Sequence, residues 1–124
     1  MTITNNYLNE VAKAMKGDSF TYSSHAAVGT GVVSALATSA TALVGEVGSR
    51  IAFTASRTNN QVTWTALRSS ASVLDTTNGD SITNAGAFPT VSGGNLDFGD
   101  VVSGVTHTTA FDLEIEFTLT YTRE

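Results

Sequence analysis

The sequence predicts an all-β protein, an antiparallel β-sandwich or small barrel, with one α-helix near the N-terminus. Three observations predict this. Apolar residues recur at the helical period only in residues 5–16, a two-residue alternation replaces that period from residue 19 onward, and the rest of the chain divides into short strands. A length of 124 residues suits one ordinary domain. We therefore expect an N-terminal amphipathic helix or arm in residues 1–17 and a single β-sandwich domain in residues 18–124.

The helical pattern runs from Asn5 to Lys16. Thr4 or Asn5 can cap its start, and Gly17 can end it. Four apolar anchors are too few for a helix of this length to be stable alone, so we expect it to dock. It either covers its own domain or acts as an arm that packs on a neighbouring subunit. The candidate interface residues on its apolar stripe are Tyr7, Leu8, Val11 and Met15.

Alternation of apolar and polar residues predicts strands in the first half of the domain. Phe20 and Tyr22 alternate with polar neighbours and lead into His25–Gly31. The segments Arg50–Arg57 and Gln61–Arg68 also alternate, and the short polar loop between them predicts a β-hairpin.

The second half of the domain ends in the clearest strand, Leu113–Tyr121. Its strict alternation indicates one buried face and one solvated face. Glu114 and Glu116 belong to the solvated face, where charge deters edge-to-edge pairing. Ser81–Phe88 and Asn95–Val102 are further strands, and Thr76–Asp80 predicts a turn.

The apolar positions of these strands predict the core. Trp64 shares its side of the strand with Val62 and Ala66, which favours packing over an exposed platform. We expect Leu8, Val11 and Met15 to be buried against the sandwich or against a partner. The predicted core residues are Phe53, Val62, Trp64, Phe88, Leu96, Phe98, Leu113, Ile115, Phe117 and Leu119.

Composition excludes several classes of function. The chain has no Cys, which removes disulfide scaffolds, thiolate metal sites and Cys nucleophiles. Six Lys and Arg against eleven Asp and Glu make sequence-independent nucleic-acid binding unexpected. Neither a signal peptide nor a membrane-spanning segment is evident, so we expect a soluble protein made in a cytoplasm.

The sequence contains no recognisable catalytic constellation. His25 and His107 lie outside any metal-binding spacing, and Gly29–Gly31 lacks the continuation of a phosphate-binding loop, so a tight turn or bulge explains it better. Asp75–Asp80 superficially resembles a calcium loop but lacks the later Glu. We therefore expect no enzyme activity, no cofactor, and no catalytic or metal-binding residue.

A series of short motifs, in order and spacing, resembles small structural proteins of tailed bacteriophages. The resemblance covers most of the chain, from residue 27 to residue 121. The motifs are Ala27–Gly31 (AVGTG), Ala42–Arg50 (AL-x-x-E closed by Arg), Gln61–Ala66, Ile82–Phe88 (I-x-x-A-G-A-F) and the alternating Leu113–Tyr121.

The chain departs from the common pattern at three places. Val32–Ala37 stands where similar proteins often carry a Pro-containing linker, Arg50 is one residue further from Glu46 than usual, and Val105–Thr109 replaces basic residues. These departures leave open whether the protein belongs to the head or to the tail.

The resemblance implies a non-enzymatic virion building block, either capsid decoration or part of the tail or baseplate. It would bind copies of itself, with a trimer as the first expectation, and other virion proteins, but neither nucleic acid nor membrane. Its location would be the virion, after synthesis in the host cytoplasm. The alternative is a carbohydrate- or receptor-binding β-sandwich module such as a fibre domain, with Tyr22, Trp64 and Tyr121 as exposed aromatic candidates.

Overall fold

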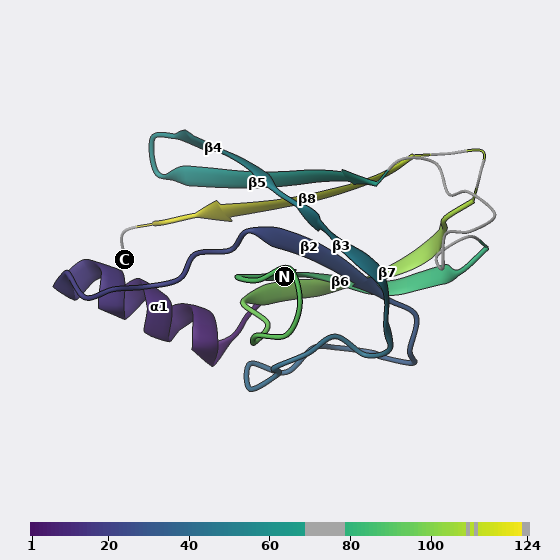
Figure 1. Cartoon of the computed structure of the whole chain (residues 1–124), viewed down its shortest axis with the longest axis horizontal. Coiled ribbons are helices and arrows are strands. Elements are labelled where there is room, and N and C mark those ends of the chain that lie inside the picture. The colour runs from purple at the N-terminus through teal and green to yellow at the C-terminus, as the bar shows by residue number, and fades with distance from the viewer. Residues whose placement is uncertain (69–78, 109, 111, 123–124) are drawn as a thin grey trace.

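The alternating segments form two antiparallel sheets that pack face to face (Figure 1). The computed structural model describes residues 1–68, 79–108, 110 and 112–122. Within these residues a five-stranded sheet has the order β1-β7-β6-β2-β3, and a three-stranded sheet has the order β4-β5-β8. The two separate sheets make the fold a sandwich. The elements are β1 (Thr2–Ile3), α1 (Asn5–Lys16), β2 (His25–Gly29), β3 (Glu46–Ala52), β4 (Thr54–Thr58), β5 (Gln61–Arg68), β6 (Ser81–Phe88), β7 (Phe98–Thr106) and β8 (Leu113–Thr120).

The predicted core is largely confirmed. Phe53, Val62 and Leu113 are only half-buried, although they pack against the core. The other seven predicted residues are buried: Trp64, Phe88, Leu96, Phe98, Ile115, Phe117 and Leu119.

Residues 30–45, which connect β2 to β3, form a loop that covers the outer face of the five-stranded sheet. Leu36 and Leu43 of this loop pack with Phe88 in a second apolar cluster. The Asn84 side chain of β6 bonds to the backbone of this loop at Val44. The Asn84 side chain accepts from the Val44 N–H at 3.1 Å and donates to the Val44 carbonyl oxygen at 3.1 Å.

The Gly29–Gly31 segment allows this loop to approach closely. A Cβ at Gly29 would lie 2.5 Å from the Val44 carbonyl oxygen. The register shift in the pairing of β2 with β3 lies between Ala26 and Val28, not at Gly29–Gly31 where a turn or bulge was expected. The glycines therefore serve backbone packing.

The predicted hairpin is confirmed as β4–β5, with Asn59 at a positive φ of 53° in its turn. The prediction of one strand from residue 50 to residue 57 was wrong. The chain passes from one sheet to the other at Phe53, between β3 and β4. Phe53 packs edge-on against Phe117, with ring centroids 6.2 Å apart, and this contact holds the corner.

Three other boundaries differ from the prediction. The segment 19–23 is not a strand, because its polar groups bond to side chains of other elements, as described below. The strand expected at Asn95–Val102 begins at Phe98 and ends at Thr106, and the strand expected at His25–Gly31 ends at Gly29. Residues 76–78 of the predicted turn lie outside the described residues, whereas Gly79 has the positive φ, 82°, of a turn residue.

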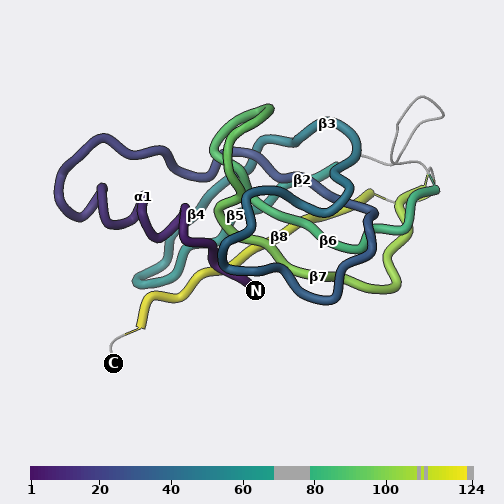
Figure 2. Tube along the Cα trace, turned by 90° about the horizontal axis from the view of Figure 1, so that it is seen from below, coloured from purple at the N-terminus to yellow at the C-terminus, as the bar shows by residue number. Residues whose placement is uncertain are grey.

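The ends of α1 follow the prediction. Thr4 is the N-cap, and Gly17 ends the helix in the left-handed conformation with a φ of 92°. Figures 1 and 2 show α1 at one end of the sandwich, outside the sheets. None of its residues is fully buried, although Tyr7 packs against the core, and the two alternatives for the rest of the helix stay predictions. Residues 1–4 nevertheless belong to the sandwich, since β1 pairs with β7.

Helices of membrane-spanning length and apolarity do not occur in the described part of the chain.

Candidate functional site

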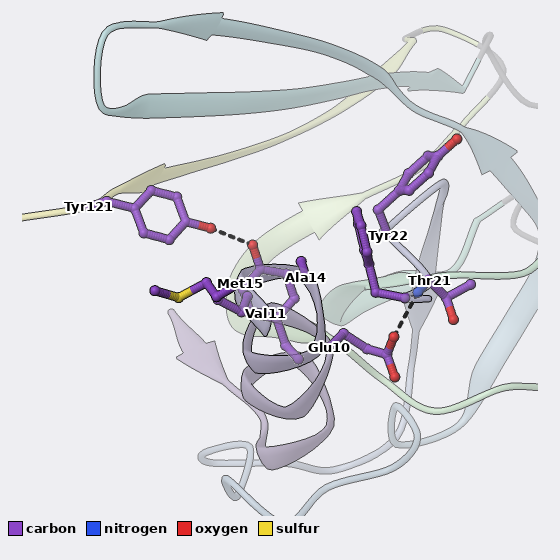
Figure 3. A pocket seen from close by; sticks show the side chains of 9 residues that line it. Glu10, Val11, Ala14, Met15, Thr21, Tyr22 and Tyr121 are labelled. Carbon is purple, nitrogen blue, oxygen red and sulfur yellow. Dashed lines mark hydrogen bonds between the residues drawn. The ribbon is translucent and has the colours of Figure 1, made fainter. Parts of the chain in front are cut away.

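An aromatic groove of about 500 Å³ lies between α1, the segment that follows it and the end of β8 (Figure 3). This volume falls within the ~300–1,000 Å³ that is typical of small-molecule sites. We call it the aromatic groove. The residues that line it are Tyr7, Glu10, Val11, Ala14, Met15, Phe20, Thr21, Tyr22 and Tyr121.

The first turn of α1 is anchored on the sandwich and forms one end of the groove. The buried Thr4 hydroxyl lies 2.6 Å from the Leu96 carbonyl oxygen and accepts from the Tyr7 N–H at 3.4 Å. The Tyr7 ring packs edge-on against Phe98, with centroids 5.4 Å apart. The later turns extend away from this anchor.

The segment 18–24 returns beside α1 and forms the second wall. The Glu10 carboxylate accepts from the Lys13 ammonium at 2.8 Å and from the Thr21 N–H at 2.6 Å, as Figure 3 shows for Thr21. The hydrogen bond from Lys13, followed by that from Thr21, lowers the pKa of Glu10. This bonding holds Phe20 and Tyr22 along the groove, with ring centroids 6.3 Å apart.

Tyr121 closes the groove from the end of β8. Its hydroxyl and the Tyr7 hydroxyl lie 2.6 Å apart. Burial, and secondly this hydrogen bond, raises the pKa of Tyr7 far above its ordinary value of 10.0. Asn60 in the β4–β5 turn fixes the Tyr121 backbone, since its amide donates to the Tyr121 carbonyl oxygen at 2.7 Å. Three distant parts of the chain therefore position the groove.

Asp97 does not line the groove but connects α1 to the returning segment. This residue is fully buried, and its carboxylate accepts from the Ser23 hydroxyl at 2.7 Å and from the Asn6 amide at 2.9 Å. Burial raises the pKa of Asp97, against the opposing effect of these two hydrogen bonds. The carboxylate thus connects α1 and the returning segment to the chain just before β7.

The structure brings three of the four sequence-predicted interface residues to the groove, namely Tyr7, Val11 and Met15. Leu8 lies outside it and is 55% exposed. Met15, at the groove rim, is 85% exposed. Leu8 and Met15 of the apolar stripe are therefore open to contact with another molecule.

Of the three aromatic candidates for carbohydrate binding, the structure excludes one and unites two. Trp64 is only 7% exposed and packs against Phe98 with ring centroids 4.9 Å apart. Tyr22 and Tyr121 line the same groove, and Tyr22 is 71% exposed.

The groove does not contain a histidine. The His25 ring Nδ1 lies 2.7 Å from the Ser24 hydroxyl, and His107 is buried in the connection after β7. Among the residues that the structure describes, no cluster of three or more His, Asp and Glu side chains could hold a metal ion. Most of the calcium-like segment 75–80 lies outside those residues.

A second surface is the outward side of the three-stranded sheet, which we call the hydroxyl face. Cross-strand pairs place the Thr63 and Thr118 hydroxyls 3.2 Å apart, and the Gln61 amide donates to the Thr120 hydroxyl at 3.1 Å. This side is uncharged at the end near α1 and carries Glu114 and Glu116 toward the other end. The predicted outward orientation of the β8 threonines and glutamates is confirmed.

Sequence reasoning missed half of the groove. Phe20 and Tyr22 were assigned to a strand, and Glu10 and Asp97 were given no local role. Phe20 and Tyr22 are two large aromatic residues in an otherwise polar stretch. That combination was the available sign of a binding surface, because outside a strand both rings are exposed.

Comparison with protein-family models, curated proteins and solved structures finds no match to this chain.

Proposed function

We propose that the protein is a non-enzymatic structural component of a tailed-phage virion, which assembles through protein–protein contacts on the capsid surface or in the tail. The motif series in residues 27–121 supports this proposal. The observation that carries it is the exposed apolar side of α1, because a helix that leaves Leu8 and Met15 in water is incomplete without a partner.

The energetics of α1 favour a protein partner. A twelve-residue helix is marginal in water, and only its first turn is anchored on the sandwich. Full burial of a side chain such as Leu8 or Met15 contributes roughly 1.5–3 kcal/mol. Docking therefore stabilises both the helix and the assembly.

The hydroxyl face supports the same function. The Thr63 and Thr118 hydroxyls already bond to each other across the strands, so displacing water from them costs little hydrogen-bonding free energy. Protein interfaces require area and complementarity more than a deep pocket.

The test combines the mass of the purified protein in solution with co-sedimentation on capsids and on tails of the phage that encodes it. We expect a mass above that of the 12.9 kDa chain, and sedimentation with one of the two particles. The double variant Leu8→Gln/Met15→Gln should remain folded and lose at least tenfold in association. A matched control is Val32→Gln/Val91→Gln, which changes two exposed apolar residues in loops away from α1.

Substitution is a sharper test than deletion of residues 1–17. Deletion would also remove β1 and the buried Thr4 cap, and would therefore damage the sandwich itself. A wild-type protein that is monomeric at every concentration and sediments with neither particle would contradict the proposed function.

A second candidate function is binding of a carbohydrate, such as a host-surface polysaccharide. The observation that favours it is the position of Tyr22, Tyr121 and Phe20 around one groove, since aromatic rings offer flat apolar faces to sugar rings.

We expect Tyr22→Ala to weaken binding of such a saccharide at least tenfold in titration calorimetry, with Val91→Ala as the control for an exposed apolar residue outside the groove. Equal binding by the wild type and Tyr22→Ala, or no binding by the wild type, would exclude this function.

A further inference from the structure

Exposed apolar side chains concentrate around α1. Ten large apolar side chains are exposed among the described residues, and five of them lie on α1 or line the groove beside it: Leu8, Met15, Phe20, Tyr22 and Tyr121. Apolar surface gathered in this way is typical of an interaction site, because its contact with water is unfavourable until a partner covers it.

The apolar residues of α1 that face away from the sandwich form a single line along the helix. Leu8, Val11, Ala12 and Met15 follow the spacing i, i+3, i+4, i+7, which places them on one side of a helix. We call these four residues the helix seam. Leu8, Ala12 and Met15 are exposed, and Val11 is half-buried at the edge of the groove.

The helix seam is complementary to itself in the antiparallel direction. Its spacing reads the same from either end, so a reversed copy places Leu8 opposite Met15 and Val11 opposite Ala12. The long side chains then meet at the two ends of the contact. The small Ala12 lies at its centre, where it allows the two helices to approach closely.

Charge does not oppose the meeting of two such surfaces. The chain has a formal net charge of −5, but the charges at α1 cancel locally. The Lys13 ammonium lies 2.8 Å from the Glu10 carboxylate, and the Lys16 ammonium lies 3.5 Å from the Asp18 carboxylate. Since a contact between identical surfaces brings like charges together, a locally neutral surface of an acidic chain favours self-association.

The attachment of α1 favours the antiparallel direction. Only the first turn is anchored on the sandwich, and Figures 1 and 2 show the later turns running outward from it. The twelve residues span about 18 Å. In an antiparallel pair the two sandwiches lie at opposite ends of the paired helices, whereas a parallel pair would bring both to the same end.

We infer that the helix seam of one copy binds the helix seam of a second copy in antiparallel orientation. A two-fold axis then passes between Val11 and Ala12, and each surface is used once, so the contact pairs molecules and closes on itself. The inference rests on the proposed assembly function and names its partner as a second copy of the chain.

Single cysteines report the direction of the contact, because the chain contains no Cys of its own. Residues 8 and 15 are about 10 Å apart along the helix axis, which is beyond the reach of a disulfide. Under mild oxidation we expect an equimolar mixture of Leu8→Cys and Met15→Cys to cross-link at least tenfold faster than either variant alone. Ala12→Cys should cross-link to its own copy. Non-reducing gels and mass spectrometry identify the products.

Two controls keep the test decisive. Lys13→Cys lies on another side of α1 and should cross-link at least tenfold more slowly than Ala12→Cys. In the Ala12→Cys background, Leu8→Gln should slow cross-linking at least tenfold, whereas Val32→Gln, at an exposed loop residue, should leave it unchanged. Circular dichroism checks the fold of every variant, and sedimentation velocity of the wild type should give the mass of two chains.

The outcomes separate this inference from the proposed function. Self-linking of Leu8→Cys and of Met15→Cys, with no gain in the mixture, would indicate parallel helices and overturn the antiparallel contact. If the wild type sediments with capsids or tails but Ala12→Cys links no faster than Lys13→Cys, the seam contacts a different virion protein and the proposed function remains. A wild type that is monomeric at every concentration and sediments with neither particle would overturn both.

Discussion

Replacing Phe98 with alanine is expected to lower the free energy of unfolding by about 3–5 kcal/mol. The Phe98 ring is fully buried and packs against three other rings. Its centroid lies 5.4 Å from Tyr7, 4.9 Å from Trp64 and 5.2 Å from Phe117. The substitution leaves a cavity where both sheets and the first turn of α1 meet, and distant strands cannot collapse into it together.

Urea unfolding followed by Trp64 fluorescence and by circular dichroism measures this change. Trp64 is the single tryptophan and touches the Phe98 ring, so its fluorescence reports the same site. The control is Phe20→Ala, in which a half-exposed ring is removed from the returning segment, and it should cost about 0.5 kcal/mol or less. If Phe98→Ala lowers the free energy of unfolding by less than about 1 kcal/mol, the ring is not central to the core.

The Asp97→Ala variant is expected to be less stable than the wild type by about 1–3 kcal/mol, because the Ser23 hydroxyl and the Asn6 amide lose their acceptor. The consequence reaches the groove, since these bonds hold both of its walls. Relative to the wild type, we therefore expect the variant to exchange amide hydrogens faster in α1 and in residues 18–24, with a smaller change in β5 and β8, measured by mass spectrometry. An equal change in all four segments would show that Asp97 does not connect the groove to the sandwich.

The same carboxyl should make stability depend on pH. Burial raises its pKa in the folded protein above the unfolded value near 3.8, so the folded state binds the proton more tightly. Stability is then greatest below the unfolded pKa, and falls as the pH rises from there through the folded pKa. In the Asp97→Asn variant this fall should disappear.

The comparison with Asp97→Asn isolates Asp97 from other groups. The lowered pKa of Glu10 acts in the opposite direction, but it is present in both proteins. The measurement is the difference in unfolding free energy between wild type and variant across the acid range. If that difference is independent of pH, the buried carboxyl is not the source of the effect.

The sequence predicted the regular elements well where a pattern was long or a special residue marked its end. The alternation in Leu113–Tyr121 corresponds to β8, Ser81–Phe88 is β6, and Gly17 ends α1 as expected. The two-residue period predicted that Trp64 is buried and that Thr118 is exposed.

The errors arose where local pattern and tertiary contacts disagreed. Alternation in segment 19–23 suggested a strand, but the Thr21 N–H bonds to Glu10 and the Ser23 hydroxyl bonds to Asp97. The alternation continues through Phe53, although the chain changes sheet there. A strand has the same two-residue period on either side of such a corner, so the pattern does not indicate the change. The apolar stripe of α1 indicated that the helix must dock, but not that its own domain leaves Leu8 and Met15 exposed.

By itself, the sequence determined the fold class, the caps of α1 and the buried side of each long strand, because these depend on neighbouring residues and on a short repeat. Only the tertiary structure decided which sheet each strand joins, and that Tyr7, Tyr22 and Tyr121 surround one groove. Strand pairing and side-chain burial join residues far apart in the chain, and no local pattern encodes those distances.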